Sequence, residues 1–84
     1  MINAEQAREM VQNFVESNGN FHIAKIEELI IEAAKVGKHF VSYKLERALA
    51  PEIRNYITIH LLSVGFQVSW DGPKTEVIIN WRKG

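Results

Sequence analysis

The stretch GFQVSWDGPKTEVIINW, residues 65–81, decides the fold. Apolar and polar residues alternate on both sides of the turn sequence DGPK, residues 71–74, and this pattern predicts a β-hairpin. A four-residue turn would place Val68 opposite Val77. One face of the hairpin then holds all the large side chains: Phe66, Val68, Trp70, Val77, Ile79 and Trp81. We predict that this face packs beneath helices; the alternative is a partly exposed tryptophan with a binding role.

Two helical segments are predicted before residue 38. Asn3 can cap the first, which ends near Ser17 and has an apolar stripe of Ala7, Met10, Val11, Phe14 and Val15. The run Asn18-Gly19-Asn20 is predicted to break the helix, because glycine and asparagine tolerate left-handed backbone. The second segment runs from about residue 21 or 22 to Val36, and Gly37 stops it.

Residues 38–48 allow two interpretations. Alternation of side chains with Val, Tyr and Phe favours a strand over 39–45. The sequence LERALA has high helix propensity, so a helix that starts at Ser42 is the alternative. A further helix is predicted over 51–64, with Pro51 in its first turn and Gly65 just beyond its end.

The predicted fold is a single α+β domain, residues 1–84, in the order α-α-β-α-β-β. The segment Val77–Ile79 is apolar on both faces, which indicates a central strand. We therefore expect a three-stranded antiparallel sheet in the order 1-3-2, covered by helices on one face. The last residues, 82–84, form a polar end.

Composition limits the function classes. The chain has 84 residues, ten basic and ten acidic residues and no cysteine. The absence of cysteine excludes disulfides, thiol chemistry and thiolate metal sites. So short a chain is marginally stable alone, and oligomerisation would help it. The polar start MINAEQAREM is unlike a signal peptide, and no apolar run has membrane-spanning length, so we predict a soluble cytoplasmic protein without a membrane partner.

We predict no catalytic, cofactor-binding or metal-binding residue. The three histidines, His22, His39 and His60, have no partner at metal-ligand spacing, and His60 lies on an apolar stripe where a core or boundary histidine is expected. Gly37-Lys38 lacks the earlier glycine and the hydroxyl residue of a phosphate-binding loop. Glu28 and Glu32 share only a solvated helix face. The chain is therefore predicted to be neither an enzyme nor a carrier of a small molecule or cofactor.

Nucleic-acid binding is the alternative function. Helices followed by a hairpin suggest a winged helix, and a helix over 42–49 together with 51–64 would make a helix–turn–helix. The second of these helices offers few groups for groove recognition: Arg54, Asn55 and Thr58, with His60 at its edge. The hairpin tip adds Lys74. Zero net charge also disfavours this function, because phosphate binding needs basic residues.

The chain resembles a group of small, mostly uncharacterised phage-encoded proteins. The shared pattern covers about residues 26–81: Ile30, Ala33-Ala34, Gly37-Lys38, then Leu61, Gly65-Phe66 and Val68, then Ile79 and Trp81. The resemblance implies a phage origin and a compact α+β module in the host cytoplasm or sometimes with virions. It carries over no catalytic or binding residue. The first helix is not part of the shared pattern. Whether this chain has a partner surface of its own is therefore left open.

We therefore expect a non-enzymatic phage-type protein that acts through protein–protein interaction, as a homo-oligomer or with another protein. Association would cover a free strand edge at 39–45 and apolar residues that the core leaves over: Ile31, Phe40, Ile59 and Leu62. Each of these residues has an alternative role as core or as an isolated surface residue.

Overall fold

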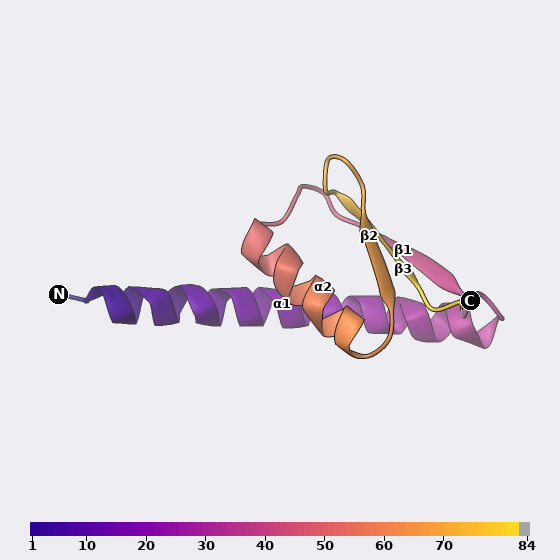
Figure 1. Cartoon of the computed structure of the whole chain (residues 1–84), viewed down its shortest axis with the longest axis horizontal. Helices are drawn as coiled ribbons and strands as arrows, with labels where there is room; N and C mark the ends of the chain where they lie inside the picture. Colours follow the sequence, from indigo (N-terminus) through magenta and orange to yellow (C-terminus); the bar gives the residue numbers. More distant parts are fainter. Residues whose placement is uncertain (83–84) are drawn as a thin grey trace.

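The computed structural model describes residues 1–82 of the chain. Its elements are α1 (Ala4–Lys35), β1 (Phe40–Lys44), α2 (Pro51–Ser63), β2 (Gln67–Trp70) and β3 (Glu76–Asn80). Helix α2 and the sheet lie over one part of the long helix α1, and α2 crosses it obliquely (Figure 1). The molecule measures 54 × 24 × 21 Å. Of the predicted polar end, residues 83–84 lie outside the described part.

The predicted α+β class and the sheet order are confirmed. The sheet is antiparallel with the order β1-β3-β2, so the last strand is central as predicted. Val77 and Ile79 on β3 are fully buried beneath the helices, whereas Ile78 between them is 43% exposed on the other face. The region 39–45 forms the strand β1, and the alternative helix from Ser42 is not formed.

The predicted break at residues 18–20 is wrong, because α1 continues through it as one helix of 32 residues. Gly19 is buried where α2 crosses, and a Cβ added there would lie 2.8 Å from Cε1 of Tyr56 and closer still to Cδ1. The residues beside Gly19 hold the helix: the Asn18 side chain donates to the Phe14 carbonyl, and the Tyr56 hydroxyl donates to Asn20 Oδ1 at 2.9 Å. The glycine therefore permits close packing of two helices rather than a turn.

The other predicted helix ends are confirmed. The Asn3 side chain accepts from the Gln6 N–H, and the Gln6 side chain accepts from the Asn3 N–H, which makes a reciprocal capping box. Gly37 and Gly65 have φ of 81° and 98° just after α1 and α2, where a left-handed residue ends a helix. Pro51 begins α2, where its missing N–H costs no hydrogen bond.

The predicted register of the hairpin is wrong by two residues. Val68 pairs with Ile79, and Trp70 pairs with Val77. The reason is the Asp71 carboxylate, whose Oδ1 accepts from the N–H of Thr75 at 2.9 Å and from that of Glu76 at 3.1 Å. These bonds draw Thr75 into the turn. A shift of two residues keeps every side chain on its face, so the predicted apolar face survives.

The core is small and lies between the helices and the sheet. Its buried residues are Val15, Ile23, Ile26, Ile53, Ile57, Leu61, Val77 and Ile79. The hairpin aromatics Phe66, Trp70 and Trp81 are half-buried and pack against this cluster, which confirms the predicted packing face. The Trp70 indole N–H donates to Thr58 Oγ1 at 2.8 Å, and Phe66 meets Trp81 edge to face at 6.0 Å between ring centres. Trp70 therefore ties the hairpin to α2, and Trp81 closes the packing against Phe66.

Neither helix, within residues 1–82, combines the length and the apolar composition that crossing a bilayer requires.

Candidate interaction surface

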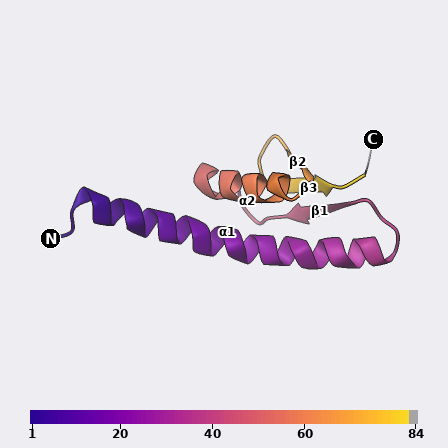
Figure 2. The same ribbon diagram turned by 60° about the horizontal axis from the view of Figure 1, so that its bottom comes forward.

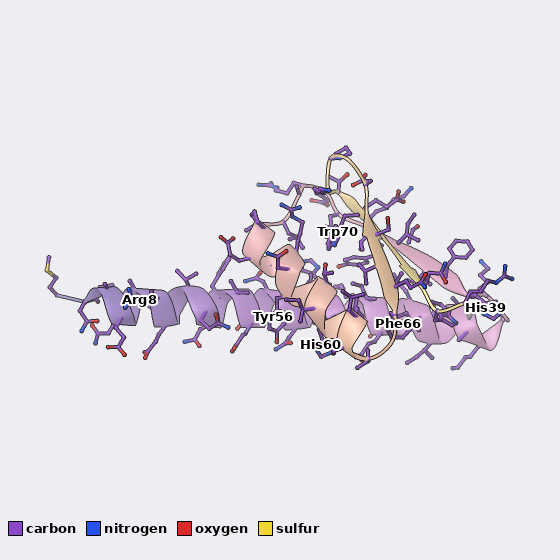
Figure 3. The ribbon with its side chains drawn as sticks, viewed as in Figure 1. Arg8, His39, Tyr56, His60, Phe66 and Trp70 are labelled. Atoms are coloured by element: carbon purple, nitrogen blue, oxygen red, sulfur yellow. The ribbon has the colours of Figure 1, made fainter. Side chains whose placement is uncertain are left out.

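The first part of α1 projects beyond the rest of the molecule. Figure 2 shows α2 and the sheet on one side of α1, with the N-terminal turns of the helix free of both. The first buried residue of α1 is Val15. We call residues 4–14 the arm; Arg8 marks it in the side-chain view (Figure 3), well away from Tyr56, Phe66 and Trp70.

An apolar stripe lies exposed along the arm and continues beyond it to Phe21. Met10 is 62% exposed, and Val11, Phe14 and Phe21 are each 57% exposed. The sequence pattern of the first helix is thus present, but of its five apolar residues only Val15 is buried in the core. We call the residues Ala7, Met10, Val11, Phe14 and Phe21 the arm stripe.

The arm stripe is not an extension of the core-facing side of α1. Successive residues of an α-helix turn by about 100°. On that spacing, the stripe is centred roughly 120° around the axis from the side that holds the buried residues Val15, Gly19, Ile23, Ile26 and Ala33. Arg8 lies on the same side as Ile26, so the core-facing side becomes polar in the arm. The helix therefore has two apolar sides, and only one is covered.

The whole molecule exposes more surface than its size requires. Its radius of gyration is 14.7 Å, whereas a compact domain of this length has about 12 Å. Its accessible surface is 6167 Å², whereas a compact monomer of this mass exposes about 5,100 Å². The excess of about 1,000 Å² arises in an elongated molecule whose longest part is α1 (Figure 1). The shape is that of a domain with one helix left partly uncovered.

Four apolar residues that the predicted core left over are also exposed. Their exposed fractions are 54% for Ile31, 56% for Phe40, 66% for Ile59 and 52% for Leu62. The strand β1 is an edge strand, as expected. Ile59 and Leu62 lie on the side of α2 opposite its buried residues, which makes them a useful comparison for the arm stripe.

A hollow of about 390 Å³ opens beside the end of the arm stripe. It is lined by Phe21, His22, residues 43–47 and Leu49. The Lys25 ammonium lies 5.0 Å from the centre of the Phe21 ring, within the range of a cation–π contact. Lys44 and Arg47 add two cations to the wall and Glu46 adds one anion, so this end of the stripe is basic.

The three histidines do not come together. His22 Nδ1 lies 2.7 Å from the Tyr43 hydroxyl, which donates to it when Nδ1 carries no proton and accepts from it when Nδ1 is protonated. Burial first, and the charge of Lys25 second, lower the pKa of His22, and burial raises the pKa of Tyr43. His60 is exposed, so its predicted core or boundary position is wrong. The reason is that α2 packs against the core through a narrow side, whose buried residues are Ile53, Ile57 and Leu61. Residues 1–82 contain no cluster of three or more His, Asp or Glu side chains that could hold a metal ion.

The helix–turn–helix required by the alternative function is not formed. Residues 40–44 are a strand, and the chain between β1 and α2 is irregular. The helix α2 thus lacks the preceding helix that would cross a nucleic-acid backbone. Two of the residues predicted for groove recognition, Arg54 and Thr58, are engaged inside the protein, with the Leu49 carbonyl and the Trp70 indole respectively.

Comparison of the chain with protein-family models, with curated proteins and with solved structures gave no match.

Proposed function

We propose that this chain is a non-enzymatic protein that acts through protein–protein contact and self-associates through the arm stripe. The observation that supports the proposal is the apolar stripe on a projecting helix, which faces away from the protein's own core. Exposed apolar surface of this kind on a small domain is typical of an interaction site.

The energies favour a weak and reversible association. Full burial of a side chain such as Met, Val or Phe contributes about 1.5–3 kcal/mol. Four such residues of the stripe are more than half exposed, so two copies have several of these contributions to gain. Association costs about 4–15 kcal/mol in lost freedom of motion. We therefore expect a monomer–dimer equilibrium that shifts with concentration.

Light scattering on a column tests the proposal over a wide concentration range. The double variant Met10→Gln, Phe14→Gln removes two stripe residues but keeps good helix formers. We expect the wild-type protein to reach the dimer mass at high concentration and the variant to stay monomeric. The matched control is Ile59→Gln, Leu62→Gln, which removes two equally exposed apolar residues from α2 and should leave association unchanged.

A wild-type protein that stays monomeric at the highest concentration would contradict the proposal. Loss of association in the α2 variant, with none in the arm variant, would place the contact elsewhere. Circular dichroism of each variant should match the wild type, because all four residues are exposed and none belongs to the core.

The sequence pattern over residues 26–81 supports a phage origin as part of this proposal. The genomic neighbourhood tests it: adjacent virion genes would favour a structural role, and adjacent early genes a role in the host cell. A host chromosomal neighbourhood with no phage genes would contradict the origin.

A further inference from the structure

The residues of the arm stripe fit a second copy of this chain in one orientation. In a heptad repeat, positions a and d form the seam between two packed helices. Counting from Ala4 as position a, the seam residues are Ala4, Ala7, Val11, Phe14, Asn18 and Phe21. Val11, Phe14 and Phe21 are more than half exposed, so the seam is free over its length of about 26 Å.

We infer that two copies pair residues 4–21 of α1, the arm and the two turns that follow it, in antiparallel orientation, with residue 12 of one copy beside residue 13 of the other at the two-fold axis. This inference rests on the proposed self-association and adds its geometry. In this register the numbers of two residues that lie level with each other add up to 25. The layers are Ala4 with Phe21, Ala7 with Asn18, and Val11 with Phe14.

Side-chain volume supports this register. Each larger residue then faces a smaller one, and Phe21 in particular faces the methyl group of Ala4. Because well-packed interfaces alternate large and small side chains, the helices can keep an even separation along the seam. Parallel arms would put Phe14 against Phe14 and Ala7 against Ala7, which makes some layers too wide and others too narrow.

Charge supports the same orientation. Residues 1–24 contain one arginine and three glutamates, a net charge of −2, and residues 25–84 contain nine basic and seven acidic residues, a net charge of +2. Parallel arms would place each of Glu5, Glu9 and Glu16 level with the same residue of the second copy, whereas antiparallel arms place only Glu9 and Glu16 level with each other. Antiparallel arms place Glu5 of the second copy level with Asn20, the residue before Phe21, and Phe21 lines the basic hollow that also carries Lys44 and Arg47.

The fold leaves room for the second arm. The seam is centred about 100° around α1 from the side that α2 and the sheet cover, similar to the angle between neighbouring contacts in a four-helix bundle. The second arm and α2 can therefore lie beside α1 at the same level. The molecule's excess surface of about 1,000 Å² is comparable to the 800 Å² or so that each partner buries in a stable complex.

Cysteine cross-linking tests the register, because the natural chain contains no cysteine. The variants Ala7→Cys and Asn18→Cys are prepared separately, mixed at a concentration where light scattering finds dimer, and oxidised. In the antiparallel register Cys at 7 faces Cys at 18 of the other copy, whereas like residues lie about 17 Å apart, beyond disulfide reach. We expect the mixed dimer, identified by intact mass, to exceed either single-variant dimer by about tenfold.

Each other outcome overturns the inference in a distinguishable way. A monomeric wild type contradicts both the inference and the proposed function. If the Ala7→Cys variant cross-links best with itself, the arms are parallel. That result overturns the inference but leaves the proposed function standing. A dimer that forms no disulfide in the mixture associates through another surface. Adding Phe14→Gln to both cysteine variants is the control, and it should reduce the mixed dimer to the background of random oxidation.

Discussion

Gly19 is the residue at which the local pattern and the structure differ most. The pattern predicts a helix end there, whereas Gly19 lies inside a helix where the ring of Tyr56 packs onto its Cα. A glycine supplies either left-handed backbone or close approach, and the sequence alone does not distinguish the two. The partner that decides it, Tyr56, is 37 residues away in the chain.

The substitution Gly19→Ala is therefore expected to destabilise the protein, although alanine is the better helix former. Alanine gains about 1 kcal/mol of helix propensity, but its methyl group collides with the Tyr56 ring, and overpacking of this kind costs about 1–3 kcal/mol. Urea unfolding should show a net loss of about 1 kcal/mol. Gly72→Ala is the control, because open space surrounds Gly72, and its free energy of unfolding should stay close to the wild type. A stabilised Gly19→Ala protein would contradict the observed packing.

His22 should make stability depend on pH. Burial and Lys25 lower the pKa of His22 in the folded state below the usual 6.5. The unfolded state then takes up the proton first, so stability that is present above pH 6.5 is lost as the pH falls toward the folded pKa. Urea midpoints between about pH 8 and pH 5 should fall more for the wild type than for His22→Gln. Equal slopes for the two proteins would show that His22 titrates alike in both states.

At the scale of elements, the hairpin turn sets the register of the sheet. The alternation of side chains predicts both strands and their shared face, because period two is a local property. It does not predict the pairing, which depends on whether Thr75 belongs to the strand or to the turn. The Asp71 carboxylate decides this through two hydrogen bonds to backbone N–H groups.

Asp71→Ala is expected to destabilise the hairpin, since it leaves the N–H groups of Thr75 and Glu76 without their acceptor. Hydrogen bonds to a charged acceptor contribute about 1.5–3 kcal/mol each, and solvent at this half-exposed turn reduces that, so we expect a loss of about 1–2 kcal/mol in urea unfolding. Asp71→Asn keeps the Oδ1 acceptor and should recover most of the stability. If both substitutions cost the same, the loss comes from charge rather than from these bonds.

For the whole molecule, the main feature is the mismatch between a long helix and a short core. Helix α1 has 32 residues, but its buried residues begin at Val15, so its first turns rest on the capping box and on helix propensity. A partner on the arm stripe would add the packing that the monomer does not supply. Association should therefore stabilise the folded state.

The melting temperature of the wild type is expected to rise with protein concentration, because dimerisation binds only the folded state. At a protein concentration about one hundred times the dissociation constant, dimerisation adds about 2.7 kcal/mol to the free energy of unfolding. The Met10→Gln, Phe14→Gln variant should melt at one temperature throughout, which calorimetry at several concentrations would check. A wild-type melting temperature that does not move with concentration would count against the dimer.

The sequence by itself determined the α+β class, the strands, the helix over 51–64 and the central place of the last strand. These follow from spacing along the chain: periods of about 3.6 and 2.0, Pro51 at a helix start, and Gly37 and Gly65 at helix ends. Tertiary structure alone decided that α1 runs unbroken through Gly19 and which of its two apolar sides is covered. Both depend on where α2 crosses, and that contact joins residues too far apart in the chain for any local pattern to record.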